Sequence, residues 1–203
     1  MIDFKQRSKT AYNKKADGYD SSREGKFTQN IQHLLLAEMN WLENQNVLDV
    51  ACGTGSLLKA MNDRTPIKGF GVDISEQMIK NAAERNPDMT FHVSGCEEMP
   101  LENESMDIIT VCAAYHHFPY PAAFVKEANR ILKPKGTVYI ADLHIPAFLR
   151  VLVNPFVPLL LKDGDVKLYS PKGIVADFMR LGFDSAKYKI IGNAQIVLLK
   201  KGK

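Results

Sequence analysis

The sequence predicts a doubly wound α/β fold, with a seven-stranded, mostly parallel sheet, helices on both faces and a C-terminal antiparallel strand. Strand-like and helix-like segments alternate from residue 46 onward, which is typical of parallel strands joined by crossover helices. The apolar run at residues 107–113 suits a parallel strand that is covered on both faces. Near the C-terminus, two strand-like segments flank Gly192-Asn193, a tight-turn pair that predicts an antiparallel hairpin.

Hydrophobic patterns and capping residues place the individual elements. We expect strands at 47–51, 67–72, 89–93, 107–113, 137–141, 183–190 and 194–199. We expect helices at 56–63, from Ser75 onward, at 121–132, and from Pro171 to Leu181. Ser75 and Ser170 are the predicted N-caps, and Gly182 is the predicted left-handed C-cap. Ahead of the first strand, the spacing of Ile31, Leu34, Leu35 and Met39 predicts an amphipathic helix.

The chain is expected to form one domain. No internal repeat or long linker divides its 203 residues, and that length suits a single well-buried core. Within 1–203 we expect a helical lead-in at 1–45, a ligand-binding core at 46–142, an insertion at 145–168 and a C-terminal helix and hairpin at 170–203.

Composition and charge exclude several classes of protein. Hydrophobic residues make up 45% of the chain and charged residues 24%, which is ordinary for a globular protein. The net charge of +3 is too small for a concentrated nucleic-acid-binding face, so we expect no nucleic-acid partner. The three cysteines follow no metal-binding pattern, so we expect no metal site and no disulfide, as in a reducing cytoplasm. Arg150 and three prolines interrupt the apolar stretch 145–161, so we expect no transmembrane helix.

The first strand–loop–helix unit is the predicted ligand site, because ligands of open parallel sheets bind beyond the carboxyl ends of the strands. The loop there is Ala51-Cys52-Gly53-Thr54-Gly55, whose glycines let the backbone turn sharply and approach a ligand. Asp73 stands at the end of the second strand, twenty residues after Gly53. Its carboxylate can accept hydrogen bonds from both hydroxyls of a ribose. Loop and acid together predict a nucleoside site.

Two residues favour one nucleoside over another. A dinucleotide-binding loop has a third glycine for close helix packing, and Leu58 stands at that position here. Asp49 lies inside the strand just ahead of the loop, where a carboxylate would repel a pyrophosphate but attract an amine. This contrast favours S-adenosylmethionine over a nicotinamide dinucleotide.

Five sequence blocks occur in an order that is typical of one enzyme family. They are Leu48-Asp49-Val50-Ala51-Cys52-Gly53-Thr54-Gly55; Val72-Asp73-Ile74-Ser75; Glu98-Met99-Pro100-Leu101 with Ser105-Met106-Asp107; His116-His117-Phe118; and Arg130-Ile131-Leu132-Lys133-Pro134. With these blocks the chain resembles class I S-adenosylmethionine-dependent methyltransferases, most closely the group that includes the ubiquinone and menaquinone biosynthesis methyltransferases. The resemblance covers about residues 12–142 strongly and the rest loosely. It implies S-adenosyl-L-methionine as cofactor and S-adenosyl-L-homocysteine as product.

The resemblance also implies roles for individual residues. Asp49 would hold the methionine ammonium, the loop would lie under the methionine and ribose, and Asp73 would take the ribose hydroxyls. Ile74 and Met78 would pack on adenine, and an aromatic ring of the lead-in, Tyr12 or Tyr19, would close over the cofactor. The full candidate set is Tyr12, Tyr19, Asp49, Ala51, Cys52, Gly53, Thr54, Gly55, Ser56, Asp73, Ile74, Met78, Gly95, Cys96, Glu97 and Cys112.

Two positions depart from the family pattern. Members of the group usually carry an acid two residues after the third strand to bind the adenine amine, and Gly95 occupies that place here. Glu97 is the nearest acid that can substitute for it. The turn after Arg130 normally reads Pro-Gly-Gly, and Lys135 replaces its first glycine. That turn is structural, so we expect only a local change.

His117 and the insertion each leave two interpretations open. His117 could deprotonate a hydroxyl nucleophile as a catalytic base, or it could serve packing and hydrogen bonding at a helix start. The apolar stretch 147–161 could cover a pocket for a hydrophobic acceptor, or pack on the core or on a partner chain.

Three functions compete at this stage. The first is methyl transfer to a small-molecule acceptor, the second is a binding module that keeps the cofactor site without turnover, and the third is a dehydrogenase. Leu58 and Asp49 disfavour the dehydrogenase. The sequence leaves the acceptor, the methylated atom and the oligomeric state open, with monomer and homodimer both allowed.

Overall fold

A computed structural model describes residues 3–203, and all its strands join one sheet in the order β3-β2-β1-β4-β5-β7-β6. The strands are β1 (Asn46–Val50), β2 (Lys68–Asp73), β3 (Thr90–Val93), β4 (Met106–Cys112), β5 (Leu132–Leu143), β6 (Phe183–Ile191) and β7 (Ala194–Lys201). Strands β1 to β5 pair in parallel, whereas β7 pairs antiparallel with both β5 and β6. The predicted seven-stranded α/β fold is confirmed.

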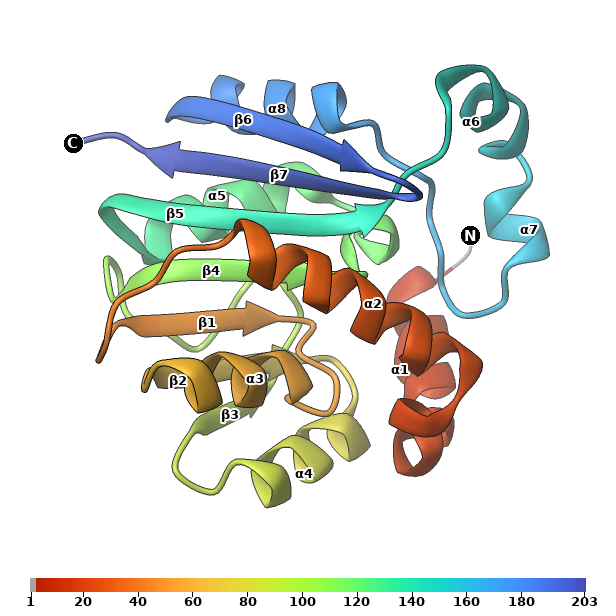
Figure 1. Cartoon of the computed structure of the whole chain (residues 1–203). Coiled ribbons are helices and arrows are strands. Elements are labelled where there is room, and N and C mark those ends of the chain that lie inside the picture. Colours follow the sequence, from red (N-terminus) through yellow and green to blue (C-terminus); the bar gives the residue numbers. More distant parts are fainter. Residues whose placement is uncertain (1–2) are drawn as a thin grey trace.

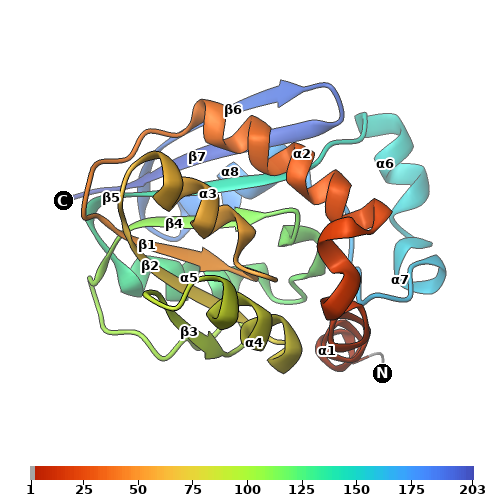
Figure 2. The ribbon, with the colours of Figure 1, turned by 60° about the horizontal axis from the view of Figure 1, so that its bottom comes forward.

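Helices cover both faces of the sheet (Figures 1 and 2). They are α1 (Phe4–Lys15), the 3-10 helix η1 (Ala16–Ser21), α2 (Arg23–Glu38), α3 (Ser56–Arg64), α4 (Glu76–Arg85), the 3-10 helix η2 (Tyr115–His117), α5 (Pro121–Ile131), α6 (Ala147–Val153), α7 (Val157–Leu160) and α8 (Pro171–Arg180). Helix α2 crosses in front of β4 and β5 in Figure 1, and α5 and α8 lie behind the sheet. Among residues 3–203, no helix combines the length and the apolar character needed to cross a bilayer.

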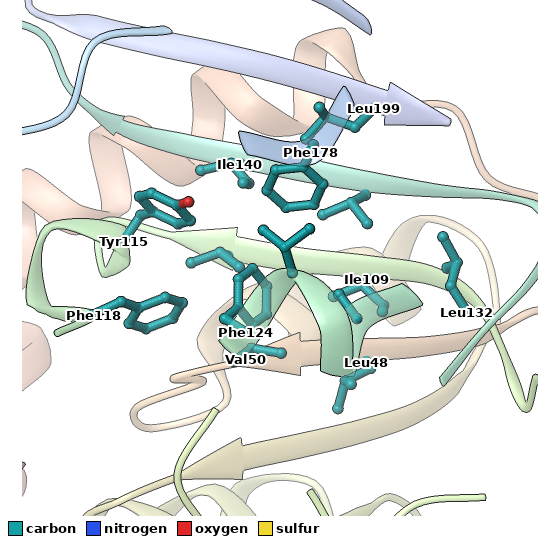
Figure 3. Close-up of a cluster of buried hydrophobic side chains, with 14 of the residues drawn as sticks. Leu48, Val50, Ile109, Tyr115, Phe118, Phe124, Leu132, Ile140, Phe178 and Leu199 are labelled. Atoms are coloured by element: carbon teal, nitrogen blue, oxygen red, sulfur yellow. The ribbon is translucent and has the colours of Figure 1, made fainter. Parts of the chain in front are cut away.

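Two hydrophobic layers fix the sheet between its helices. Behind it, Phe124 of α5 and Phe178 of α8 pack on strand residues such as Leu48 and Ile109, as Figure 3 shows. In front, Leu35 of α2 and Leu58 of α3 belong to the second layer, and both are fully buried. Leu58 therefore packs between α3 and the sheet. A third glycine at this position, as in dinucleotide-binding loops, would let the helix lie closer to the sheet.

The strand order reverses beside β1, which has β2 on one side and β4 on the other, both parallel to it. Chain connections leave these two neighbours in opposite directions, so a crevice opens at the carboxyl ends of the strands. In Figure 1 those ends point toward α1, α6 and α7. The predicted glycine loop follows β1 at this edge of the sheet.

The expected elements are present, with differences in the second half of the chain. Strand β5 begins at Leu132, directly after α5, rather than at residue 137. The C-terminal hairpin inserts its second strand, β7, next to β5, so that β6 forms the edge of the sheet. The lead-in contains α1 and η1 in addition to the expected α2, and the insertion contains α6 and α7, which the sequence analysis did not place.

Lys135 occupies a backbone conformation that favours glycine. Its φ is +64°, and its N–H donates to the carbonyl of Gly202 at 3.0 Å. The family's glycine would adopt this left-handed conformation without the steric cost that a Cβ brings. The departure is a local one, as expected.

We expect Lys135→Gly to stabilise the protein by about 0.5–1 kcal/mol, because relief of the left-handed strain outweighs the extra freedom of glycine in the unfolded chain. The measurement is urea unfolding, with a raised midpoint and an unchanged slope. Lys133→Gly, in the same strand but without a positive φ, is the matched control and should destabilise. A lowered midpoint for Lys135→Gly would contradict the strain argument.

Candidate active site

A deep pocket opens at the carboxyl ends of β1, β2 and β4. About 980 Å³ of space lies between its walls, part of it open to solvent. Its walls come from the loop after β1, the ends of β2 and β4, the segment after β3, and helices α1 and α2. Two buried carboxylates, Asp49 and Asp73, lie in its lining.

Asp73 organises the floor of this pocket. One carboxylate oxygen accepts the backbone N–H of Gly53 at 2.9 Å, and the other accepts the N–H of Ser75 at 2.9 Å. The carboxylate thereby joins the glycine loop to the start of α4, where Ser75 caps the helix as predicted. Each oxygen keeps a second lone pair, and two such oxygens at one strand end can accept both hydroxyls of a ribose.

Asp49 is a buried carboxyl group on β1 with one side-chain partner. The Thr110 hydroxyl on β4 donates to its Oδ1 at 2.7 Å. Burial raises the pKa of Asp49 to about 7, against the hydrogen bond from Thr110 and with the help of the charge on Asp73. An acid that is costly to ionise when alone is a strong site for a cation, because a bound ammonium would restore its charge.

Two alanines with positive φ flank the pocket floor. Ala51 follows β1 with φ +57°, and Ala113 follows β4 with φ +52°. Non-glycine residues rarely adopt this conformation, and such strain clusters at binding sites. Both residues line the pocket. Alanine has the smallest side chain that carries a Cβ, so these two residues take up little of the pocket space.

The lead-in closes over the pocket and is held there by polar contacts. Thr54 donates its hydroxyl to Asp20 of η1 at 2.8 Å, and Arg85 of α4 also pairs with Asp20. On α1, Asn13 accepts the Ser75 hydroxyl at 2.6 Å. These contacts join residues that lie 34 to 65 positions apart in the sequence. The lead-in is therefore fixed against the loop after β1 and against α4.

Glu97 occupies the space left free by Gly95. A Cβ at residue 95 would lie 2.8 Å from Oε2 of Glu97, so the glycine lets that carboxylate fold back into the pocket. Lys5 of α1 pairs with the same oxygen at 2.8 Å. The other oxygen, Oε1, is buried and has no hydrogen-bond partner within residues 3–203. A buried acceptor without a partner is costly, and an amine donor of a ligand would satisfy it.

Tyr12, Glu24 and His117 form a hydrogen-bonded chain on the pocket wall. The Tyr12 hydroxyl donates to Glu24 at 2.9 Å, so at its 3.0 Å contact with Nε2 of His117 it must act as acceptor. This assigns the proton of the neutral ring to Nε2 and leaves Nδ1 as an acceptor, which is buried and without a partner in the described chain. Burial and the neighbouring charge of His116 lower the pKa of His117 well below its usual value.

The adjacent histidine has a different environment. The ring of His116 contacts Asp142 at 2.7 Å through Nδ1, and Nε2 lies 3.5 Å from Asp165. Burial works against a charged ring, but these two carboxylates outweigh it and raise the pKa of His116. Ligand-type atoms of His116, His117 and Asp165 lie within 4.8 Å of one another, the grouping nearest to a metal-ligand set in residues 3–203. The two carboxylates beside His116 favour its protonated form, and in that form the grouping would be an ion-pair cluster.

The structure brings nearly all of the predicted site residues to this pocket. Those that line it are Tyr12, Tyr19, Asp49, Ala51, Cys52, Gly53, Thr54, Ser56, Asp73, Ile74, Met78, Gly95, Cys96, Glu97, Cys112 and His117. Gly55 lies behind the loop instead, where a Cβ would come within 2.7 Å of Asn86 and φ is +71°. Burial raises the pKa of the thiols of Cys52, Cys96 and Cys112, so all three are neutral lining groups.

The sequence analysis missed four polar lining residues of the lead-in. Lys5 and Ser8 lie on α1, and Thr28 and Gln32 lie on α2. A periodic signal was available for all four. Lys5, Ser8 and Tyr12 are spaced i, i+3, i+7, and Thr28 and Gln32 are spaced i, i+4, so each set shares one helix face.

The fold and the pocket are those of an α/β domain with a ligand site at the carboxyl ends of its strands, and comparison with known proteins shows what this domain is similar to. Residues 48–140 match the family described as "Methyltransferase domain". Over this part, just under half of its length, the chain is similar to class I methyltransferases of the group that includes the ubiquinone and menaquinone biosynthesis enzymes.

A curated relative is similar to part of the chain. A demethylmenaquinone methyltransferase of Chlorobaculum parvum is 35% identical over 100 residues, which are 49% of this chain and 42% of that protein. The chain thus spans less than half the length of this curated relative.

Solved structures share the fold. A putative methyltransferase of Haloferax volcanii, in complex with the Trm112 activator, has a TM-score of 0.81 at 20% identity and covers 97% of this chain and 96% of that one. Phosphoethanolamine N-methyltransferase 2 of Haemonchus contortus, bound to phosphomonomethylethanolamine and S-adenosylhomocysteine, has a TM-score of 0.78 at 15% identity, over 100% of this chain and 61% of that one.

We expect Asp49→Asn to stabilise the ligand-free protein above pH 7 and to have little effect near pH 4. The folded pKa of about 7 lies above the ordinary value of 3.8. The stability that Asp49 contributes is therefore present below pH 4 and is lost as the pH rises to about 7. Thermal unfolding from pH 4 to pH 8 measures the difference, which should grow to pH 7 and then level off. A constant difference across this range would contradict the raised pKa.

Proposed function

We propose that this protein is an S-adenosylmethionine-dependent methyltransferase that acts on a small apolar acceptor in the cytoplasm. The observation that carries the proposal is the pair of buried carboxylates, Asp49 and Asp73, under one pocket. Two anions disfavour a pyrophosphate and favour a cationic nucleoside, which S-adenosylmethionine is. The match of residues 48–140 to the methyltransferase family and the cofactor product bound in the Haemonchus contortus enzyme support the same ligand.

The pocket offers a partner for each polar part of this cofactor. Asp49 would hold the methionine ammonium, and Asp73 would accept the ribose hydroxyls. The unpaired Oε1 of Glu97 would accept the adenine amine, with Ile74 and Met78 packed on the ring. Glu97 would thereby bind the adenine amine, which most members of the group bind with an acid at the position of residue 95. Lys5, on the lid helix, would hold that carboxylate in place from the other side.

When bound, S-adenosylmethionine supplies an activated methyl group on a sulfonium centre. The residues of this chain would contribute position and a dry environment. Asp49, Asp73 and the glycine loop would hold the donor, and Tyr12 and Tyr19 of the lead-in would exclude water above it. Orientation of two reactants accounts for much of the rate of such in-line reactions, and a base that removes a proton from the acceptor would add to it.

His117 is our candidate for proton removal from the acceptor. Its ring is held by Tyr12 and Glu24 in the tautomer that leaves Nδ1 free to take a proton. Burial keeps this ring neutral, and its lowered pKa matches an acidic hydroxyl such as a phenol better than an alcohol. The names of relatives that act on quinones support an acceptor of this kind.

We expect S-adenosylhomocysteine to bind about tenfold more weakly at pH 6 than at pH 8, because Asp49, with its pKa of about 7, must ionise to hold the ammonium. Isothermal titration calorimetry measures both affinities. In Asp49→Asn the binding should be at least about tenfold weaker at pH 8, and flat with pH. No binding of this ligand at either pH, or tight binding of a nicotinamide dinucleotide instead, would overturn the proposed function.

We expect label from methyl-labelled S-adenosylmethionine to enter the organic-soluble fraction of a metabolite extract incubated with the protein. His117→Gln should slow this transfer by about 100-fold and leave the affinity for S-adenosylhomocysteine nearly unchanged. His144→Gln, which alters a histidine outside the pocket, is the matched control. Cofactor binding without any labelled product would favour the binding module, and an unchanged rate in His117→Gln would make that residue structural.

A further inference from the structure

The insertion carries a concentration of exposed apolar side chains that the cofactor site does not use. Helices α6 and α7 and their linker expose nine large hydrophobic residues, with exposed fractions from 38% to 72%: Phe148, Leu149, Val151, Leu152, Val153, Phe156, Leu159, Leu160 and Leu161. We call them the α6–α7 apolar surface. Only seven other large hydrophobic residues are comparably exposed in residues 3–203, and they are scattered along the chain.

These helices do not pack their apolar residues into the core. Helix α6 buries none of its residues, and α7 buries only Val157. In Figures 1 and 2 both helices project beyond the carboxyl ends of the strands, and α7 is the one that lies nearer to α1. With seven and four residues they are far too short to span a bilayer. A bilayer could therefore contact them only at its surface.

Basic side chains adjoin the α6–α7 apolar surface. The Arg7 guanidinium donates to the carbonyl of Pro158 at 3.2 Å, which joins α1 to α7. Beside this contact runs a groove whose charged residues are Arg7, Lys14, Lys15 and Lys162 against Asp3 and Asp163. Lys15 is paired with Glu24 and Asp163, whereas Arg7, Lys14 and Lys162 form no ion pair with any residue in 3–203. Helix α1 contains no acidic residue at all.

We propose that the α6–α7 apolar surface and this basic groove dock the protein on the surface of an anionic lipid bilayer. Apolar side chains would enter the boundary between headgroups and acyl chains, while Arg7, Lys14 and Lys162 would meet the negative headgroups. A second copy of this chain fits less well, because a symmetric contact would bring the two basic grooves toward each other. This charge pattern favours a lipid surface as the occupant.

Docking would give an apolar acceptor a direct route to the pocket, an extension that rests on the proposed function. The α6–α7 apolar surface follows β5, whose carboxyl end lies at the same edge of the sheet as the pocket. Ser8 of α1 lines that pocket and donates its hydroxyl to the backbone carbonyl of Asp163, two residues after the α6–α7 apolar surface ends. An acceptor dissolved in the bilayer would then reach His117 without crossing water.

The test is co-sedimentation with vesicles of phosphatidylcholine alone and of phosphatidylcholine with phosphatidylglycerol, without cofactor or acceptor. We expect binding to the anionic vesicles and weaker binding to the neutral ones. Leu160→Glu should weaken the binding about tenfold or more. Leu42→Glu is the matched control, because Leu160 is 71% exposed and Leu42 is 70% exposed. Leu42 precedes β1 and so lies near the amino ends of the strands, away from the α6–α7 apolar surface.

A charge variant and two further measurements complete the test. Lys14→Gln with Lys162→Gln should weaken binding to the anionic vesicles about tenfold and leave binding to neutral ones unchanged. Absence of vesicle binding, or equal binding by Leu160→Glu and Leu42→Glu, would overturn the proposal. So would light scattering that shows a wild-type dimer which Leu160→Glu dissociates. Binding of S-adenosylhomocysteine by the same sample separates failure here from failure of the proposed function.

Discussion

The carboxylate of Asp73 is the contact on which the site depends. It accepts the N–H groups of Gly53 and Ser75, so a single side chain at the end of β2 sets both the glycine loop and the start of α4. These two segments form the floor of the pocket, and the lead-in is held against them through Thr54 and Ser75. Loss of this carboxylate would therefore release the loop, the helix start and the lid together.

The pocket contains polar groups and backbone conformations that are energetically unfavourable in the free protein. Asp49 is held where ionisation is costly, Glu97 keeps one oxygen without a partner, and Ala51 and Ala113 adopt strained backbone conformations. Each feature costs stability in the free protein and, under the proposed function, would be relieved or used when a cationic amine-bearing nucleoside fills the pocket. Stability and cofactor affinity are therefore expected to oppose each other at Asp49.

Local sequence patterns predicted the fold well in segments whose structure depends on nearby residues alone. The strands, Ser75 as a cap and the hairpin at Gly192 all depend on short-range periodicity or turn chemistry, and the structure has them within a few residues. The insertion was not predictable in this way. Its apolar run suits burial, yet nine of its large side chains are exposed, because whether a helix is buried depends on the surface that the rest of the chain offers it.

By itself the sequence determined the parallel sheet, the glycine loop and the two carboxylates at strand ends, because strand order and spacing place such residues at one edge. Only the tertiary structure decided which lead-in residues reach the pocket, that Glu97 folds into the space of residue 95, and that Tyr12 orients His117. These contacts join residues far apart in the chain. Their geometry depends on the packing of whole helices, which no local pattern encodes.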